Sequence, residues 1–220
     1  MSNPLFLILR LEAPMQSWGL YTRYDFRNTN LEPTKSGLIG LLACALGYHH
    51  NDPQILELDL NLTLAIRVER EGDISLDYQT IKGSLNSKRK IRDETIVSKR
   101  KYIFDGSFLA IFAGNFELLT KCAQALQNPK WILYLGRKSC PPTRPPFEEL
   151  SPKYSSLEEA IRYHPWQSSF PIPKTLKCII EDPLGENLLQ DRITNTPISR
   201  LYSFRNIRRF QVPIPKAKIL

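Results

Sequence analysis

The order of apolar runs and helical patterns along this chain is the feature that most limits which fold it can adopt. Short apolar or alternating runs predict strands, and apolar residues spaced on one helical face predict helices. In chain order the predicted elements are strand 5–11, helix 36–46, strand 60–70, strand 108–113, helix 116–126 and strand 131–135. This order predicts an α+β fold: a ferredoxin-like (RRM-like) βαββαβ domain with two helices on one face of an antiparallel sheet.

Positive charge is concentrated in two segments of a chain whose formal net charge is +8. The first, 82–101, lies in an insertion: strand patterns at 74–81 and 95–104 flank a polar, basic stretch, so residues 72–104 are expected to form a protruding β-hairpin. The second, 200–220, contains arginines and lysines but no acid. Two basic segments on a slightly acidic body indicate a nucleic-acid footprint. The alternative is that both are solvated surface segments.

The C-terminal third has a weaker pattern. Proline becomes frequent, and only strands at 175–181 and 202–212 and a short helix starting near Ser155 are predicted. We therefore expect a ferredoxin-like RNA-binding domain at 1–146, which includes the hairpin. A small, irregular, β-rich C-terminal extension at 147–220 is expected to pack on it.

Two short stretches are candidates for phosphate binding. Lys35 and Ser36 open the helix at 36–46, where unpaired backbone N–H groups and the helix dipole favour an anion. The second stretch begins at Gly136, where a predicted strand ends and a backbone without a side chain can approach a ligand closely. It continues with Arg137, Lys138 and Ser139, which could bind phosphate or a base edge. A plain basic loop is the alternative for this second stretch.

Catalytic chemistry has little support. The four cysteines are far apart and no metal-ligand spacing occurs, so the sequence predicts no metal, no other cofactor and no catalytic residue. The alternative function is a metal-independent endoribonuclease, with a general base, a general acid and a cation. Its residues would be His49, His50, Tyr24 or Tyr48, and Lys35. A small-molecule enzyme on this fold has no supporting cluster.

The sequence also indicates the cellular location of the protein and the surface that would bind RNA. No apolar run approaches the roughly 18 residues of a membrane span, and no secretory signal is visible, so we expect a cytoplasmic protein without membrane contact. The stretch FLAIFAGNF lacks the basic residue and the glycines of the usual RNA-recognition strand. Phe108 and Phe112 are therefore expected in the core, and RNA binding is expected from loops and the hairpin.

Five stretches together carry a resemblance to a known family. They are LRLEAPMQSWG (9–19), PTKSGLIGLLACALG (33–47), DYQTIKG (77–83), ETIVSKRKYIFDGSF (94–108) and YLGRKSCPPTRP (134–145). In these stretches the chain resembles the CasD family, the subunit that caps the 5′ end of the guide RNA in type I-E CRISPR Cascade complexes.

The resemblance implies a non-catalytic subunit of an antiviral ribonucleoprotein complex. It would bind the 5′ handle of the crRNA, cap one end of the complex and support DNA targeting. The implied partners are crRNA, the Cascade backbone subunit, the large PAM-reading subunit and target DNA near the PAM-proximal end. The hairpin would be the family's thumb, which presses on the guide. For the endoribonuclease alternative, the resemblance implies CRISPR repeat RNA as the substrate to be processed. In type I-E systems a separate endoribonuclease cleaves that repeat, so the resemblance argues against catalysis here.

The resemblance also implies specific RNA contacts. The expected handle contacts are Gln16, Trp18, Lys35, Ser36, Arg137, Lys138 and Ser139. The expected thumb contacts are Lys82, Lys88, Arg89, Lys99 and Arg100. Arg23 and Arg144 complete the set of candidate RNA-binding residues.

Overall fold

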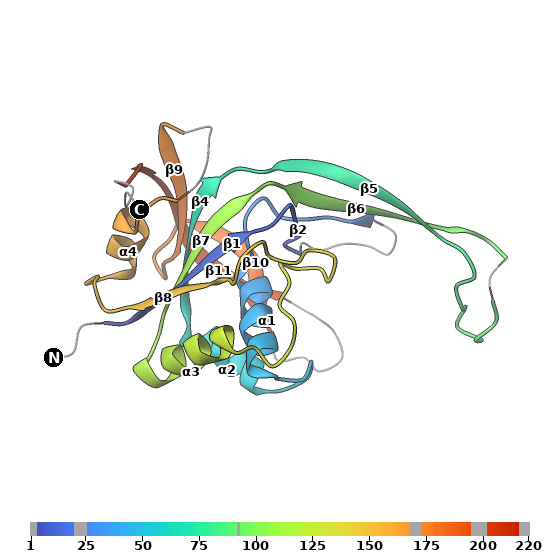
Figure 1. The fold of residues 1–220 in the computed structure, drawn as a ribbon, viewed down its shortest axis with the longest axis horizontal. Helices are drawn as coiled ribbons and strands as arrows, with labels where there is room; N and C mark the ends of the chain where they lie inside the picture. Colours follow the sequence, from blue (N-terminus) through green and yellow to red (C-terminus); the bar gives the residue numbers. More distant parts are fainter. Residues whose placement is uncertain (1–3, 20–25, 92, 168–172, 195–201, 216–220) are drawn as a thin grey trace.

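A computed structural model of this 220-residue chain describes residues 4–19, 26–91, 93–167, 173–194 and 202–215. Within these ranges the chain forms four helices and eleven strands (Figure 1). The helices are α1 (Lys35–Leu46), α2 (Gln54–Asn61), α3 (Phe116–Gln127) and α4 (Leu157–Tyr163). The strands are β1 (Phe6–Glu12), β2 (Met15–Gln16), β3 (Phe26–Arg27), β4 (Thr63–Arg70), β5 (Asp73–Ile81), β6 (Ile96–Phe104), β7 (Ser107–Ala113), β8 (Phe147–Ser151), β9 (Thr175–Glu181), β10 (Asn187–Ile193) and β11 (Tyr202–Pro213). None of the helices in these ranges is long and apolar enough to cross a membrane.

Seven strands form one antiparallel sheet in the order β10-β11-β9-β4-β7-β1-β8. Helices α1 and α2 connect β1 to β4, and α3 follows β7. Strands beyond residue 146 pair on both sides of the N-terminal ones, β8 with β1 and β9 with β4. The fold is therefore a mixed α+β fold in which the two parts of the chain share one large sheet.

Most predicted elements are confirmed with bounds that differ by about a residue, but the predicted strand at 131–135 is wrong. This segment is irregular, and β8 takes the sheet edge beside β1. Leu133 and Leu135 are buried in the core while Ile132 is 88% exposed. The Leu135 amide donates to the Cys140 carbonyl at 2.8 Å instead of to a strand. A short apolar run occurs both in buried strands and in loops whose leucines reach the core. The run at 131–135 therefore could not distinguish a strand from a loop.

Helix α2 is absent from the sequence prediction, and the strand predicted at 60–70 begins later, at Thr63. Leucine stands at every second position from 56 to 64, across the boundary between α2 and β4. In the helix, Leu58 is buried and Leu60 is 57% exposed, whereas Leu64 is buried in the sheet. The alternation continues through both elements, so it could not mark where the helix ends.

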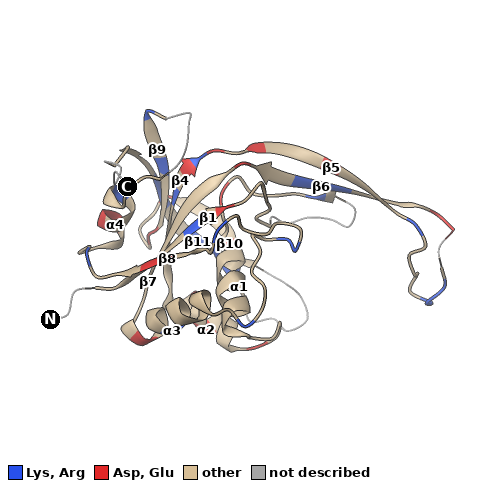
Figure 2. Ribbon diagram, viewed as in Figure 1, with Lys and Arg blue, Asp and Glu red and all other residues tan. Residues whose placement is uncertain are grey.

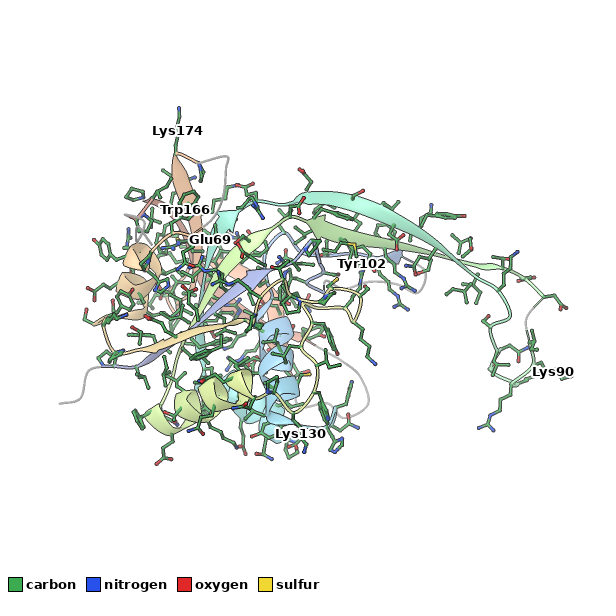
Figure 3. All side chains as sticks on the ribbon, viewed as in Figure 1. Glu69, Lys90, Tyr102, Lys130, Trp166 and Lys174 are labelled. Atoms are coloured by element: carbon green, nitrogen blue, oxygen red, sulfur yellow. The ribbon has the colours of Figure 1, made fainter. Side chains whose placement is uncertain are left out.

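Strands β5 and β6 form a long hairpin that leaves the body of the molecule, as predicted (Figure 1). We call this hairpin the thumb. The other edge of β6 pairs with β2 near the root and, in parallel, with β3. Lys and Arg gather on β6 and at the tip (Figure 2). Figure 3 places Tyr102 near the root and Lys90 at the tip.

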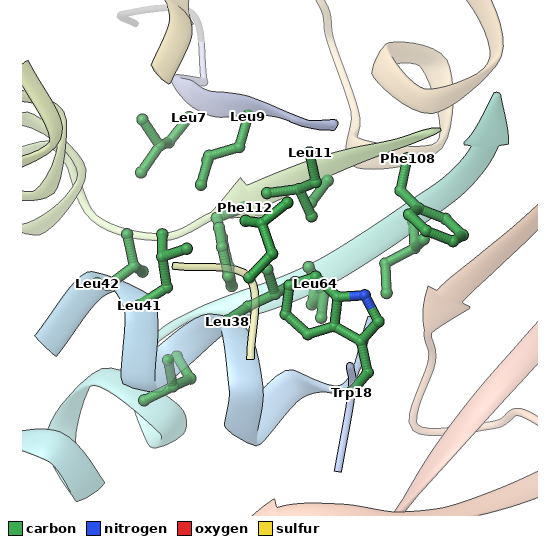
Figure 4. Close-up of a cluster of buried hydrophobic side chains, with 14 of the residues drawn as sticks. Leu7, Leu9, Leu11, Trp18, Leu38, Leu41, Leu42, Leu64, Phe108 and Phe112 are labelled. Carbon is green, nitrogen blue, oxygen red and sulfur yellow. The ribbon is translucent and has the colours of Figure 1, made fainter. Parts of the chain in front are cut away.

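The main core lies between the large sheet and helices α1, α2 and α3. Successive side chains of a strand point to opposite faces, and on this face β1 contributes Leu7, Leu9 and Leu11 (Figure 4). Strand β7 contributes Phe108 and Phe112, which are at most 1% exposed. Both phenylalanines are thus core residues, as predicted.

The opposite face of the sheet packs on α4 and holds a buried ionic network. Arg10 on β1 donates to Glu148 on β8 at 2.7 Å and to Glu69 on β4 at 3.1 Å, and Arg67 also pairs with Glu69. His164 Nε2 lies 3.1 Å from the Glu148 carboxylate. Burial alone would raise the pKa of Glu148, but His164 and Arg10 together bring that pKa down to about 2.

Candidate nucleic-acid interface

The start of α1 is filled by the protein's own carboxylates. Thr34 caps the helix, and the Lys35 amide donates to Asp191 Oδ2 at 2.7 Å. The Lys35 ammonium lies 2.9 Å from Glu181, and the residue is 1% exposed. The expectation of an open phosphate seat at Lys35 is therefore wrong, because a β10 side chain already supplies the anion that the helix start favours. Ser36 beside it is half-buried.

The arginines of the C-terminal basic segment also have internal partners. Arg205 is 3% exposed and donates to both oxygens of Asp191, at 2.7 and 2.9 Å. Arg208 donates to Asp182 at 3.1 Å, and Arg209 to Glu32 at 2.8 Å. For these arginines the expectation of a second nucleic-acid footprint is wrong, since each one neutralises a carboxylate of the same chain. Residues 200, 216 and 218 lie outside the described ranges.

Gln16 and Trp18 are both fully buried. Trp18 Nε1 donates to Gln16 Oε1 at 3.1 Å, and Gln16 Nε2 donates to the Gly106 carbonyl at the thumb root at 2.7 Å. The Trp18 ring packs so closely on α1 that a Cβ at Gly37 would lie 3.0 Å from it. These two side chains therefore link the 15–19 segment to α1 and to the thumb root.

Gly136 approaches another part of the chain and not open space. Its φ is +91°, and a Cβ there would lie 1.6 Å from the Ser17 carbonyl oxygen. Ser17 N in turn donates to the Leu135 carbonyl at 3.1 Å. The expectation that Gly136 leaves room for a ligand is corrected: the glycine lets the 136–140 loop lie against the 15–19 segment.

Arg137 and Ser139 are brought together with Tyr102 at the thumb root. The Arg137 guanidinium stacks on the Tyr102 ring at 4.5 Å and donates to the carbonyls of Lys101 and Arg27 at 3.0 and 3.2 Å. The Ser139 hydroxyl lies 3.3 Å from the Tyr102 hydroxyl. Burial alone would raise the pKa of Tyr102, but Ser139 and the Arg137 charge leave it below its ordinary value.

Four cations surround this point, and we call them the root patch: Arg27, Arg100, Arg137 and Lys138. Arg27 and Arg100 are paired in register on β3 and β6, and Lys138 is exposed next to Arg137. Asp77 lies opposite Arg100, but its carboxylate accepts from Gln79 at 2.6 Å. In the described part of the chain, none of the four forms an ion pair with a carboxylate.

The remaining candidates are not members of the root patch. Lys82, Lys88 and Arg89 are exposed at the thumb tip, and Lys99 is exposed on β6. Arg144 lies 3.8 Å from Glu148 on β8. Arg23 lies outside the described residues.

Sequence reasoning missed Arg27, Lys101 and Tyr102. Lys101 stands at the end of the basic segment 82–101, so local charge could have found it, whereas Arg27 lies outside both basic segments. Nothing in the sequence showed that Tyr102 would stack on Arg137.

The residues of the endoribonuclease alternative are not brought together. Lys35 is the first residue of the 12-residue helix α1, and His49 follows its last turn, so about 18 Å of helix separates them. His49 packs edge-on against Trp131 at 5.5 Å, and His50 Nδ1 lies 2.8 Å from Asn51. The prediction of a single site that combines Lys35 with these histidines is therefore wrong. Tyr24 lies outside the described residues.

Comparison with known proteins gives consistent matches. The protein-family model described as CRISPR-associated protein (Cas_Cas5) matches residues 6–214. The CRISPR system Cascade subunit CasD of Escherichia coli strain K12 is 33% identical over an alignment of 173 residues, and the match covers 73% of this chain and 77% of the relative.

Two solved structures are also similar over nearly the whole chain. A crystal structure of a Cas protein is 30% identical with a TM-score of 0.75, and the match covers 96% of this chain and 98% of that one. A chain of a CRISPR RNA-guided surveillance complex is 28% identical with a TM-score of 0.79, and the match covers 96% and 91%. Together with the family match from β1 to β11, these similarities show that the chain belongs to the Cas5 family of CRISPR-associated proteins.

Proposed function

We propose that this protein is an RNA-binding, non-catalytic subunit of a Cascade-type surveillance complex in the cytoplasm. It binds the 5′ handle of the crRNA and caps one end of the complex. The observation that carries the proposal is the root patch: its cations have no carboxylate partner in the described chain, whereas the arginines at 205, 208 and 209 are neutralised internally. Cations whose charge is not neutralised by a carboxylate of the same chain attract a phosphate backbone and release its counterions.

The strand order supports the fold that the proposal assumes. Strands β4-β7-β1-β8 lie side by side and antiparallel, with helices between β1 and β4 and between β7 and β8. This order supports the proposal that these four strands and their helices form a ferredoxin-like unit. We interpret β9, β10 and β11 as an extension of that unit, supplied by the part of the chain beyond residue 146.

The proposed RNA contacts fall into two groups. The root patch and Ser139 bind the handle, and the tip cations Lys82, Lys88 and Arg89 contact the guide farther along the thumb. Gln16, Trp18 and Lys35 act indirectly, because their polar atoms hold the 15–19 segment, the thumb root and α1 in place. The backbone subunit, the large PAM-reading subunit and nearby target DNA are the proposed neighbours, in line with the relative named a Cascade subunit.

The test is a salt titration of binding to labelled repeat-derived RNA in EDTA, with RNA integrity followed in the same samples. In Arg100→Gln/Lys138→Gln, the slope of log K against log salt should become shallower by roughly 1.4, because two contacts to single-stranded phosphate are lost. Arg208→Gln/Arg209→Gln removes the same charge from paired positions and should leave the slope unchanged. Equal slopes in both double variants would refute the proposed interface. A defined RNA cut would refute the non-catalytic assignment.

A further inference from the structure

The two faces of the thumb differ in chemistry. Register and alternation place Asp73 and Asp77, the acids of β5, on the face that carries Arg100 and Tyr102. The other face, which we call the outer face, carries no acid from either strand. It displays Ile74, Leu76 and Tyr78 of β5 with Lys99 and Lys101 of β6, and Phe26 of β3.

A single row of side chains crosses three strands of the outer face. Lys99 is in register with Tyr78 on one side and with Phe26 on the other. Neighbouring strands lie about 4.8 Å apart, so the two aromatic residues flank the lysine on backbones that are about 10 Å apart. Tyr78 is 59% and Phe26 is 40% exposed. Lys101 Nζ lies 5.6 Å from the Phe26 ring and adds a second cation beside it.

We propose that the row Tyr78–Lys99–Phe26 is a stacking platform for unpaired bases of a single-stranded RNA, with Lys99 at the phosphate between them. This inference rests on the proposed RNA-binding function. Aromatic rings that alternate with cations are the pattern by which proteins hold single strands with little sequence preference, because every base has a face that can stack. Lys99 forms no ion pair in the described ranges, so its charge is available to a phosphate.

The platform continues the root patch. Phe26 and Arg27 are neighbours in β3, and their side chains point to opposite faces of the thumb sheet. An RNA strand held at Arg27 therefore reaches the platform by crossing β3. The missing acids and the two lysines favour a polyanion over a protein surface as the occupant.

The experiment uses an unstructured RNA of about twelve nucleotides that contains 2-aminopurine, whose fluorescence falls when the base stacks. The purified full chain should quench the probe. Tyr78→Ala and Phe26→Ala should each weaken binding roughly 5- to 150-fold and lose quenching, with the salt slope unchanged because no charge is removed. Tyr78→Phe should keep both affinity and quenching. Lys99→Gln should make the slope shallower by roughly 0.7.

Tyr163→Ala and Phe116→Ala are matched controls, since these rings are 67% and 70% exposed on α4 and α3. Both should bind and quench like the unmodified chain. RNA binding could depend on the root patch and yet remain intact in Tyr78→Ala and Phe26→Ala. That result would overturn the platform but not the proposed function, and it would make the outer face a surface for a protein neighbour. No binding by the unmodified chain would overturn the proposed function and the platform together.

Discussion

At the scale of single residues, Gly136 determines where Arg137 lies. Its backbone sits against the Ser17 carbonyl with φ +91°, a conformation that L side chains rarely adopt. The next residue then stacks on Tyr102. The 15–19 segment, the 136–140 loop and the thumb root thus contact one another and together position the root patch.

Gly136→Ala should lower the free energy of unfolding by about 3 kcal/mol or more, because the new methyl group has no room beside Ser17. Gly83→Ala is the control: its φ is +67°, but a Cβ there meets nothing within 4 Å. It should cost only the backbone penalty of about 1–2 kcal/mol. Urea unfolding measures both, and equal losses would show that the contact with Ser17 is unimportant.

Single residues also show how far sequence reasoning reaches. Lys35 and Lys138 were equally good candidates from local sequence, yet Lys35 is buried and Lys138 is exposed. The partner of Lys35 is Glu181, 146 residues farther along the chain. Residue type and local charge identified the basic loop at 137–139. The pairing that removed Lys35 depends on tertiary contacts that no local pattern contains.

At the scale of elements, α1 joins the helical layer to the C-terminal strands. Its first residue contacts Glu181 on β9 and Asp191 on β10, and Arg205 on β11 binds the same Asp191. Thr34 and Gly47, the capping residues of α1, could be recognised from sequence because capping is local. The carboxylates at its start could not be recognised, because they come from distant strands.

Lys35→Met should lower the free energy of unfolding by about 3 kcal/mol, because the half-buried Glu181 loses its nearest cation and keeps only Arg205 at 3.9 Å. In the double variant Lys35→Met/Glu181→Gln the loss should be smaller than the sum of the single losses. Lys174→Met, at an exposed position, is the control and should change little. RNA affinity of the folded Lys35→Met protein should stay unchanged. Normal stability with lost RNA binding would contradict this and make Lys35 an RNA ligand.

At the scale of the whole molecule, the ionic network around Glu148 joins both parts of the chain. Its members come from β1, β4, β8 and the segment after α4. The sheet that they cross is likewise built from both parts of the chain. The order of strands was largely predictable from sequence up to β7, whereas the pairing of the later strands depends on weakly patterned segments such as 187–193.

Acid should destabilise the molecule through Glu148. Its pKa is about 2 when folded, below the ordinary 4.5, so its stabilisation is present above about pH 4.5 and is lost as pH falls towards 2. The amount is on the order of 3 kcal/mol. Glu148→Gln should be less stable at neutral pH and should lose less on acidification, measured by urea unfolding across pH. Glu186→Gln, an exposed site, is the control. A parallel pH profile for Glu148→Gln would contradict the assignment.

The strand order has a consequence for synthesis on the ribosome. Strand β11 is translated after β9 and β10 yet lies between them, and β8 and β9 close the two sides of β1-β7-β4. When α3 has just been made, both sides of that three-stranded group are open, and open strand edges pair with other chains. Folding therefore finishes late in translation. A chain truncated after α3 is therefore expected to aggregate and not to form a smaller working subunit.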